Sequence, residues 1–178
     1  MDLGSNHFEL FGLPVGFEID TAQLAEKYRE LQRVLHPDRF ANASDRERRL
    51  SVQHAAQVNE AYQTLRSPLR RARYLLELRG VEFDDERQTH LDPEFLMAQM
   101  ELREALAAVR GQADPFAALN RLLADLARER EALEAELARH LAQEDADALE
   151  AARQIVQKLQ FFARLQEEAE EIEESLLD

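Results

Sequence analysis

Residues 28–40 read Tyr28-Arg29-Glu30-Leu31-Gln32-Arg33-Val34-Leu35-His36-Pro37-Asp38-Arg39-Phe40. Apolar residues spaced three or four positions apart predict an amphipathic helix over 21–35, and a similar stripe predicts a second helix over 45–66. Because proline disfavours the α conformation of the residue before it, Pro37 predicts that the first helix stops at His36. The segment therefore predicts a helical hairpin whose connecting loop exposes His36, Pro37 and Asp38.

The exposed side of the first helix is basic. At about 100° per residue, Arg29 and Arg33 lie opposite Leu31, one turn apart, on the helix that ends at the loop. In the loop, the carboxylate of Asp38 suits a bidentate hydrogen bond from an arginine of another protein. A basic helix face beside an exposed acidic loop indicates a docking surface. The tripeptide by itself is weak evidence, because proline and aspartate are ordinary loop residues and His36 also suits a helix end.

Helix start signals recur along the rest of the chain. Either a capping side chain is followed three residues later by Glu or Gln, or it is followed directly by proline. Together with the apolar periods, these signals predict further helices over 6–11, 68–79, 93–110, 115–142 and 145–176. Five glycines and five prolines are too few for many short strands. The predicted fold is all-α: a helical hairpin with short helices, followed by an antiparallel three-helix bundle.

Charge divides the chain into two parts. Residues 1–80 hold 12 basic and 11 acidic side chains, whereas residues 81–178 hold 10 basic and 25 acidic ones, which together give the net charge of −14. We therefore predict two domains, 1–80 and 93–178, joined by a connector over 81–92 that has no helical period. The acidic excess argues against binding to nucleic acid or to an anionic membrane.

Residue usage also excludes several kinds of chemistry. The chain has no cysteine, which rules out disulfides, thiol nucleophiles and cysteine-held metal sites. None of its five histidines has metal-ligand spacing, so we predict no metal and no cofactor. A hydrolase built on His36 and Asp38 is a poor alternative, because no oriented nucleophile accompanies them. We expect a protein that is not an enzyme, and the lack of a signal peptide or a long apolar run favours the cytoplasm.

Residues 6–79 resemble a J domain. The resemblance rests on Phe8-Glu9-Leu10-Phe11-Gly12-Leu13, on segment 28–40 and on Val58-Asn59-Glu60-Ala61-Tyr62-Gln63-Thr64-Leu65. In that family the His-Pro-Asp loop and the basic second helix bind a heat-shock-type chaperone ATPase and stimulate its ATP hydrolysis. The resemblance therefore implies a stimulating loop of His36, Pro37 and Asp38, with helix charge from Lys27, Arg29 and Arg33. Arg39 stands where many J domains have lysine, so the charge is kept.

The helix over 93–110 carries more apolar side chains than one core stripe needs. Its predicted core side holds Phe95, Leu102, Leu106 and Val109. Its other side holds Leu96, Met97, Met100, Glu101 and Glu104. On the last helix, Phe161 and Phe162 are about 100° apart, which predicts that Phe161 lies at the edge of the core. Two interpretations follow. Either Leu96, Met97, Met100 and Phe161 form an exposed apolar patch with an acidic rim, or the buried face is wide, Met97 and Met100 belong to the core and Phe161 fills a groove.

Nearly the whole chain resembles the HscB-type J proteins of iron–sulfur cluster assembly. The resemblance rests on residues 67–79, 91–104 and 156–162 and on Leu176-Leu177-Asp178, and the lack of a cysteine-bearing N-terminal extension implies the bacterial form. In that family the C-terminal bundle binds the IscU-type cluster scaffold and delivers it to the HscA-type chaperone ATPase. The resemblance implies that the scaffold-binding residues are Leu96, Met97, Met100, Glu101, Glu104 and Phe161.

The expected function is therefore that of a co-chaperone. It would bind the cluster scaffold, stimulate the chaperone ATPase and promote cluster transfer to apo-proteins. The alternative is a J-domain co-chaperone that serves a different client, or a protein-folding adaptor.

Overall fold

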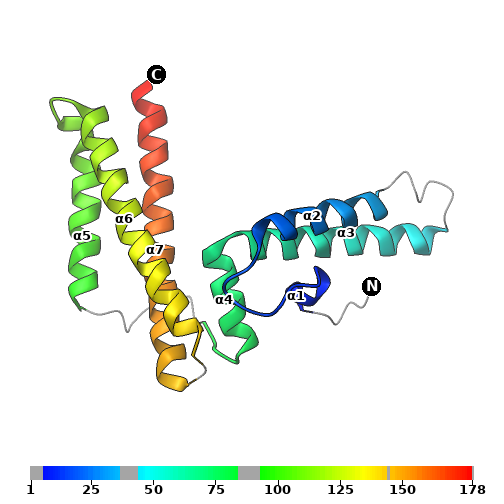
Figure 1. The fold of residues 1–178 in the computed structure, drawn as a ribbon. Coiled ribbons are helices and arrows are strands. Elements are labelled where there is room, and N and C mark those ends of the chain that lie inside the picture. Colours follow the sequence, from blue (N-terminus) through cyan, green and yellow to red (C-terminus); the bar gives the residue numbers. More distant parts are fainter. Residues whose placement is uncertain (1–5, 37–43, 84–92, 144, 178) are drawn as a thin grey trace. The chain divides into compact units, whose positions relative to one another are not determined.

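The computed structural model describes residues 6–36, 44–83, 93–143 and 145–177. Contacts divide the chain into two compact units, Met1–Arg79 (unit 1) and Gly80–Asp178 (unit 2). The described residues form seven α-helices and no strand, which confirms the predicted all-α class (Figure 1). Among these residues, no helix is long and apolar enough to cross a membrane, and no group of His, Asp or Glu side chains is placed to hold a metal ion.

The helices of unit 1 lie close to the predicted ranges. They are α1 (His7–Leu10), α2 (Thr21–Val34), α3 (Asp45–Arg66) and α4 (Pro68–Leu78). Their N-caps are Asn6, Asp20, Ser44 and Ser67. Each capping side chain accepts a hydrogen bond from a backbone N–H that the helix itself leaves unpaired. The starts are thus fixed by local chemistry that is visible in the sequence.

Helices α2 and α3 lie antiparallel and side by side, and α4 and α1 pack beside α3 (Figure 1). The largest side chains of unit 1 that are less than 2% exposed are Phe8, Leu24, Val58, Leu65, Leu75 and Leu76. The apolar stripe of α3 is predicted to be buried, but near the start of the helix Leu50 is 37% exposed. Positions 44–50 are all exposed, so the first turns of α3 lie outside the core.

Arg71 is the one charged side chain buried within the described part of unit 1. Its guanidinium donates a hydrogen bond to the carbonyl oxygen of Leu65 at 2.6 Å and lies 5.1 Å from the ring centroid of Phe17. A buried cation needs such partners, because desolvation of an unpaired charge is costly. Arg71 therefore ties the segment between α1 and α2 to the junction of α3 and α4.

His7 connects α1 to α4. Its imidazole stacks on Tyr74, with ring centroids 4.2 Å apart and planes at 17°, and its backbone N–H donates to Tyr74 Oη at 3.0 Å. Partial burial lowers the pKa of His7, because the imidazolium loses contact with water, and the negative charge of Glu60 opposes that shift. The folded unit therefore favours neutral His7.

We expect the free energy of unfolding to fall as the pH drops below about 6.5, in part through His7. Because the folded pKa is lowered, the unfolded chain binds this proton more readily. The stabilisation is complete above the unfolded pKa and is lost as the pH falls from there through the folded pKa. Carboxylates titrate at somewhat lower pH, so acidification also changes stability through them. Urea unfolding should therefore be measured for both the wild type and His7→Gln across this pH range. The variant should lose less stability on acidification, and equal losses would contradict the role of His7.

Unit 2 is an antiparallel three-helix bundle, as predicted. It contains α5 (Pro93–Ala108), a short 3₁₀ helix η2 (Val109–Gly111), α6 (Pro115–Leu141) and α7 (Ala146–Leu177). Helices α5, α6 and α7 run alongside one another (Figure 1). Since α5 has 16 residues against 27 in α6 and 32 in α7, it covers only part of their length. One core cluster of this bundle comprises Leu106, Val109, Leu119, Leu126, Phe161, Phe162, Leu165 and Ala169.

Candidate functional site

The helix before the predicted loop ends where the sequence indicated. Helix α2 ends at Val34, and Leu35 caps it with a backbone N–H that donates to the Leu31 carbonyl at 3.0 Å. Leu35 is buried whereas His36 is exposed, so the hydrophobic core stops one residue before the histidine. Pro37 and Asp38 lie outside the described residues, and their place in the loop stays a prediction.

The basic side chains of α2 are not equivalent. Arg29 and Arg33 are exposed, as the helical projection predicts. Lys27 is partly buried, and its Nζ forms an ion pair with the carboxylate of Glu30 at 3.1 Å. An ion pair that is still open to solvent adds only about 0–1 kcal/mol of stability, but it places a negative charge next to Lys27. Arg29 and Arg33 are therefore the stronger positive groups that this face offers to a partner.

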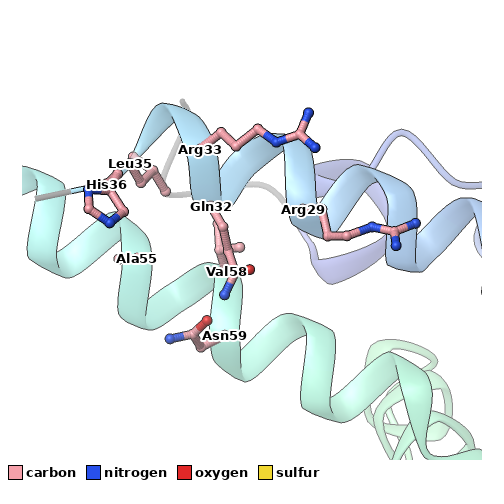
Figure 2. A pocket seen from close by; sticks show the side chains of 8 residues that line it. All are labelled: Arg29, Gln32, Arg33, Leu35, His36, Ala55, Val58 and Asn59. Atoms are coloured by element: carbon pink, nitrogen blue, oxygen red, sulfur yellow. The ribbon is translucent and has the colours of Figure 1, made fainter. Parts of the chain in front are cut away.

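Arg29, Arg33 and His36 are among the residues that line one groove between α2 and α3 (Figure 2). The groove has a volume of about 470 Å³. Its other lining residues are Gln32, Leu35, Ala55, Val58 and Asn59. Figure 2 shows Arg29 and Arg33 extending outward from α2, while Gln32 reaches toward α3. The groove thus combines positive charge, amide groups and apolar surface, which suits a protein partner that carries carboxylates.

Helix α3 supplies three lining residues that the sequence reasoning did not assign to a site. They are Ala55, Val58 and Asn59. Positions 55, 58, 59 and 62 recur every three or four residues, so these three residues share a helix face with Tyr62. Tyr62 packs against Tyr28 of α2, so this face points toward α2. A helical projection of α3 could have identified these groove residues from the sequence. Such a projection is informative only when the pairing of α3 with α2 is already known.

Tyr28 joins the two helices beside the groove. Its ring stacks on Tyr62 of α3, with centroids 3.9 Å apart and planes at 6°. Its hydroxyl donates to Asn59 Oδ1 at 2.8 Å and accepts from Gln32 Nε2 at 2.6 Å. One hydroxyl therefore holds an amide of α2 and an amide of α3.

The second predicted site lies on α5 in unit 2. Leu96, Met97 and Met100 are 45%, 64% and 64% exposed, and Glu101 and Glu104 are exposed as well. We call these five residues the α5 patch. The opposite side of the helix packs into the core through Phe95, Leu102 and Leu106. The prediction of two distinct sides is confirmed, and the interpretation that placed Met97 and Met100 in the core is wrong.

Phe161 does not belong to the exposed surface, so the prediction that it lies at the edge of the core is wrong. Its side chain is only 2% exposed. The ring meets Phe95 edge to face, with centroids 5.7 Å apart and planes at 87°, and the Arg103 guanidinium lies 5.7 Å from its centroid. Because α7 has two neighbouring helices, its buried face is wide enough for both Phe161 and Phe162.

Family models match both units. A DnaJ domain model matches residues 6–74, and a model described as the HSCB C-terminal oligomerisation domain matches residues 91–170. A co-chaperone protein HscB homolog from Shewanella baltica is 52% identical over 174 residues, which are 97% of this chain and 99% of the relative. The corresponding protein from Aeromonas salmonicida is 49% identical over 173 residues, with the same coverage.

Solved structures agree with these sequence matches. The chaperone HscB from Vibrio cholerae is 47% identical with a TM-score of 0.87, covering 97% of this chain and 99% of that one. The human co-chaperone protein HscB is 31% identical with a TM-score of 0.89, covering 97% of this chain and 84% of the human one. The resemblance that the motifs predicted is thus confirmed, and the chain belongs to the HscB family of J-domain co-chaperones.

Proposed function

We propose that unit 1 docks on an HscA-type chaperone ATPase and stimulates its ATP hydrolysis. The observation that supports this most directly is that Arg29, Arg33 and His36 all line one groove. Exposed guanidinium groups attract a partner that carries carboxylates and hold it by charge-assisted hydrogen bonds. Docking there brings the partner to His36, from which the predicted loop of Pro37 and Asp38 continues. In this proposal the ATPase performs all of the chemistry, and this protein is not an enzyme.

We propose that unit 2 binds an IscU-type cluster scaffold through the α5 patch. Exposed apolar side chains that the core does not need usually mark an interface, and Leu96, Met97 and Met100 form such a group. Methionine side chains adapt to irregular partner surfaces. Glu101 and Glu104 add a rim that favours a cationic partner. Phe161 has a supporting role here, because it packs under Phe95 and does not reach the surface.

A chain that carries both the groove and the α5 patch can bring the ATPase and the scaffold into one complex. Unit 2 holds the scaffold and its iron–sulfur cluster, which is cargo and not a cofactor of this protein. Unit 1 recruits the ATPase to the same complex, so the ATPase meets the bound scaffold at a high effective concentration. The outcome that we propose is cluster transfer from the scaffold to apo-proteins in the cytoplasm.

Higher salt is expected to weaken ATPase docking more than scaffold binding. The docking charges, Arg29 and Arg33, are exposed, and mobile ions screen such charges beyond about 10 Å at 0.1 M salt. The centre of the α5 patch is apolar and less sensitive. Steady-state ATP hydrolysis by the chaperone should be titrated with this protein at low and high salt, beside calorimetric titrations of the scaffold.

The half-stimulating concentration should rise with salt, and Arg33→Gln should flatten that dependence. A lack of stimulation even at low salt would contradict the proposed function of unit 1. A scaffold affinity that falls more steeply than ATPase docking would instead reverse the proposed division between charged and apolar contacts.

A further inference from the structure

The half of α5 that carries most of the α5 patch is held to the bundle by few side chains. Leu106, the buried residue of α5, lies near the C-terminal end of the helix. In the first two turns, residues 93–100, the three apolar side chains of the patch are exposed. Phe95 is the large apolar side chain of these turns that packs against the core cluster. The position of the patch therefore depends on how firmly Phe95 is held.

Helix α7 contacts Phe95 with three side chains of one face. Lys158, Phe161 and Phe162 are spaced by three and one residues, so they lie on the same side of the helix. The rings of Phe161 and Phe162 have their centroids 5.7 Å and 6.2 Å from the centroid of the Phe95 ring. The ammonium nitrogen of Lys158 lies over the Phe95 ring, 5.3 Å from its centroid. Two aromatic rings and one cation of α7 thus hold the first turn of α5.

The contact between Lys158 and Phe95 is a cation–π interaction. The negative face of an aromatic ring attracts a cation that lies within about 6 Å of its centroid, and the attraction is stronger where water is partly excluded. Both Lys158 and Phe95 are partly buried. A neutral polar side chain at position 158 would lose this attraction, so the charge of Lys158 contributes to keeping Phe95 on α7.

We propose that Lys158 is a positioning residue for scaffold binding, which acts through Phe95 and does not touch the scaffold. The inference rests on the proposed function of unit 2 and deepens it. While Phe95 is held, the first turns of α5 stay on α7 and present the α5 patch in one place. When Phe95 is released, only a fraction of the molecules presents the patch correctly, and the apparent affinity for the scaffold falls with that fraction.

The first test measures the anchoring of α5 in the full-length protein without scaffold. Lys158→Gln removes the charge, whereas Lys158→Arg keeps a cation that can lie over the same ring. Amide hydrogen exchange should be followed residue by residue by NMR. In Lys158→Gln, the protection of residues 97–103 should fall by about twofold to tenfold, the range that follows from the strength of such contacts. The protection of α6 should not change, and Lys158→Arg should keep the wild-type values.

The second test is calorimetric titration of the same variants with a cluster-free IscU-type scaffold. Lys158→Gln should raise the dissociation constant by up to the same factor. The matched control is Arg164→Gln, which removes a positive charge from an exposed position of the same helix and should bind like the wild type. Phe95→Leu should also weaken binding. Adding Lys158→Gln to Phe95→Leu should weaken it no further, because the ring through which Lys158 acts is then absent.

The inference is overturned if α5 exchanges equally fast in Lys158→Gln and in the wild type. It is also overturned if α5 exchanges faster in Lys158→Gln but the scaffold affinity is unchanged. If Lys158→Gln weakens binding equally with and without Phe95→Leu, Lys158 contacts the scaffold directly and the positioning role is wrong. If the wild type does not bind the scaffold, the proposed function of unit 2 fails and the role of Lys158 in binding falls with it, while the exchange rates still show whether Lys158 anchors α5.

Discussion

Replacing His36 by glutamine is expected to abolish stimulation of the HscA-type ATPase and to leave the fold intact. His36 is exposed and directly follows Leu35, the last buried residue of the hairpin before the loop. Its replacement leaves no cavity, so the free energy of unfolding should change by less than about 0.5 kcal/mol. Glutamine keeps a polar side chain of similar reach and removes the imidazole. Asp38→Asn should have the same effect, because the loop is proposed to act as a unit.

The matched control for this experiment is His54→Gln on α3. His54 lies in the same unit but does not line the groove. Steady-state ATP hydrolysis should be measured over a titration that reaches saturation, with thermal unfolding of each variant beside it. The His54 variant should stimulate like the wild type. A folded His36 variant that stimulates normally would contradict the assignment of His36 to the stimulating loop.

The helices could be predicted because their signals are local. A capping side chain and the N–H that it satisfies are two or three residues apart, so Asn6, Ser44 and Ser67 mark their helices without any knowledge of the fold. The two sides of α5 were predictable for the same reason, since a helix repeats its faces at a fixed angle. The family motifs then implied roles for His36 and the arginines, which no spacing rule supplies.

What the sequence did not predict depends on neighbouring helices. Leu50 has the right phase for the buried face of α3, but nothing covers the first turns of that helix among the described residues. Phe161 has the wrong phase for a narrow core stripe, yet the third helix widens the buried face and includes it. Gln32 and Asn59 share the Tyr28 hydroxyl only because α2 and α3 pair at one register. Each of these outcomes requires tertiary packing.

Replacing Phe161 by alanine is expected to destabilise unit 2 by about 3–5 kcal/mol, the usual cost of removing a buried phenylalanine ring. The ring is 2% exposed and packs against Phe95 and Phe162, with centroid distances of 5.7 Å to each. Its loss leaves a cavity that the three surrounding helices cannot fill without moving. Urea unfolding monitored by circular dichroism would measure the change. A variant with wild-type stability would show that Phe161 is not a core residue.

The exposed patch should behave in the opposite way. A triple variant with Leu96→Ala, Met97→Ala and Met100→Ala removes side chains that are 45–64% exposed. Exposed substitutions usually change stability by less than about 0.5 kcal/mol each. The triple variant should therefore keep nearly the wild-type melting temperature and lose scaffold binding, as measured by calorimetric titration with an IscU-type scaffold. Its stimulation of the ATPase without scaffold should be unchanged, because the groove lies in unit 1.

Phe161→Ala and the triple variant together distinguish residues that touch the scaffold from core residues that only hold α5 in place. Loss of scaffold binding by Phe161→Ala alone would be ambiguous, since a weakened core also disturbs α5, which carries the patch. Loss of binding by the triple variant at unchanged stability has only one source, the removed surface. If the triple variant melts many degrees lower, these side chains are part of the core after all. If it is stable and still binds the scaffold, the client surface lies elsewhere on the bundle, and the apolar side of α5 then requires another partner.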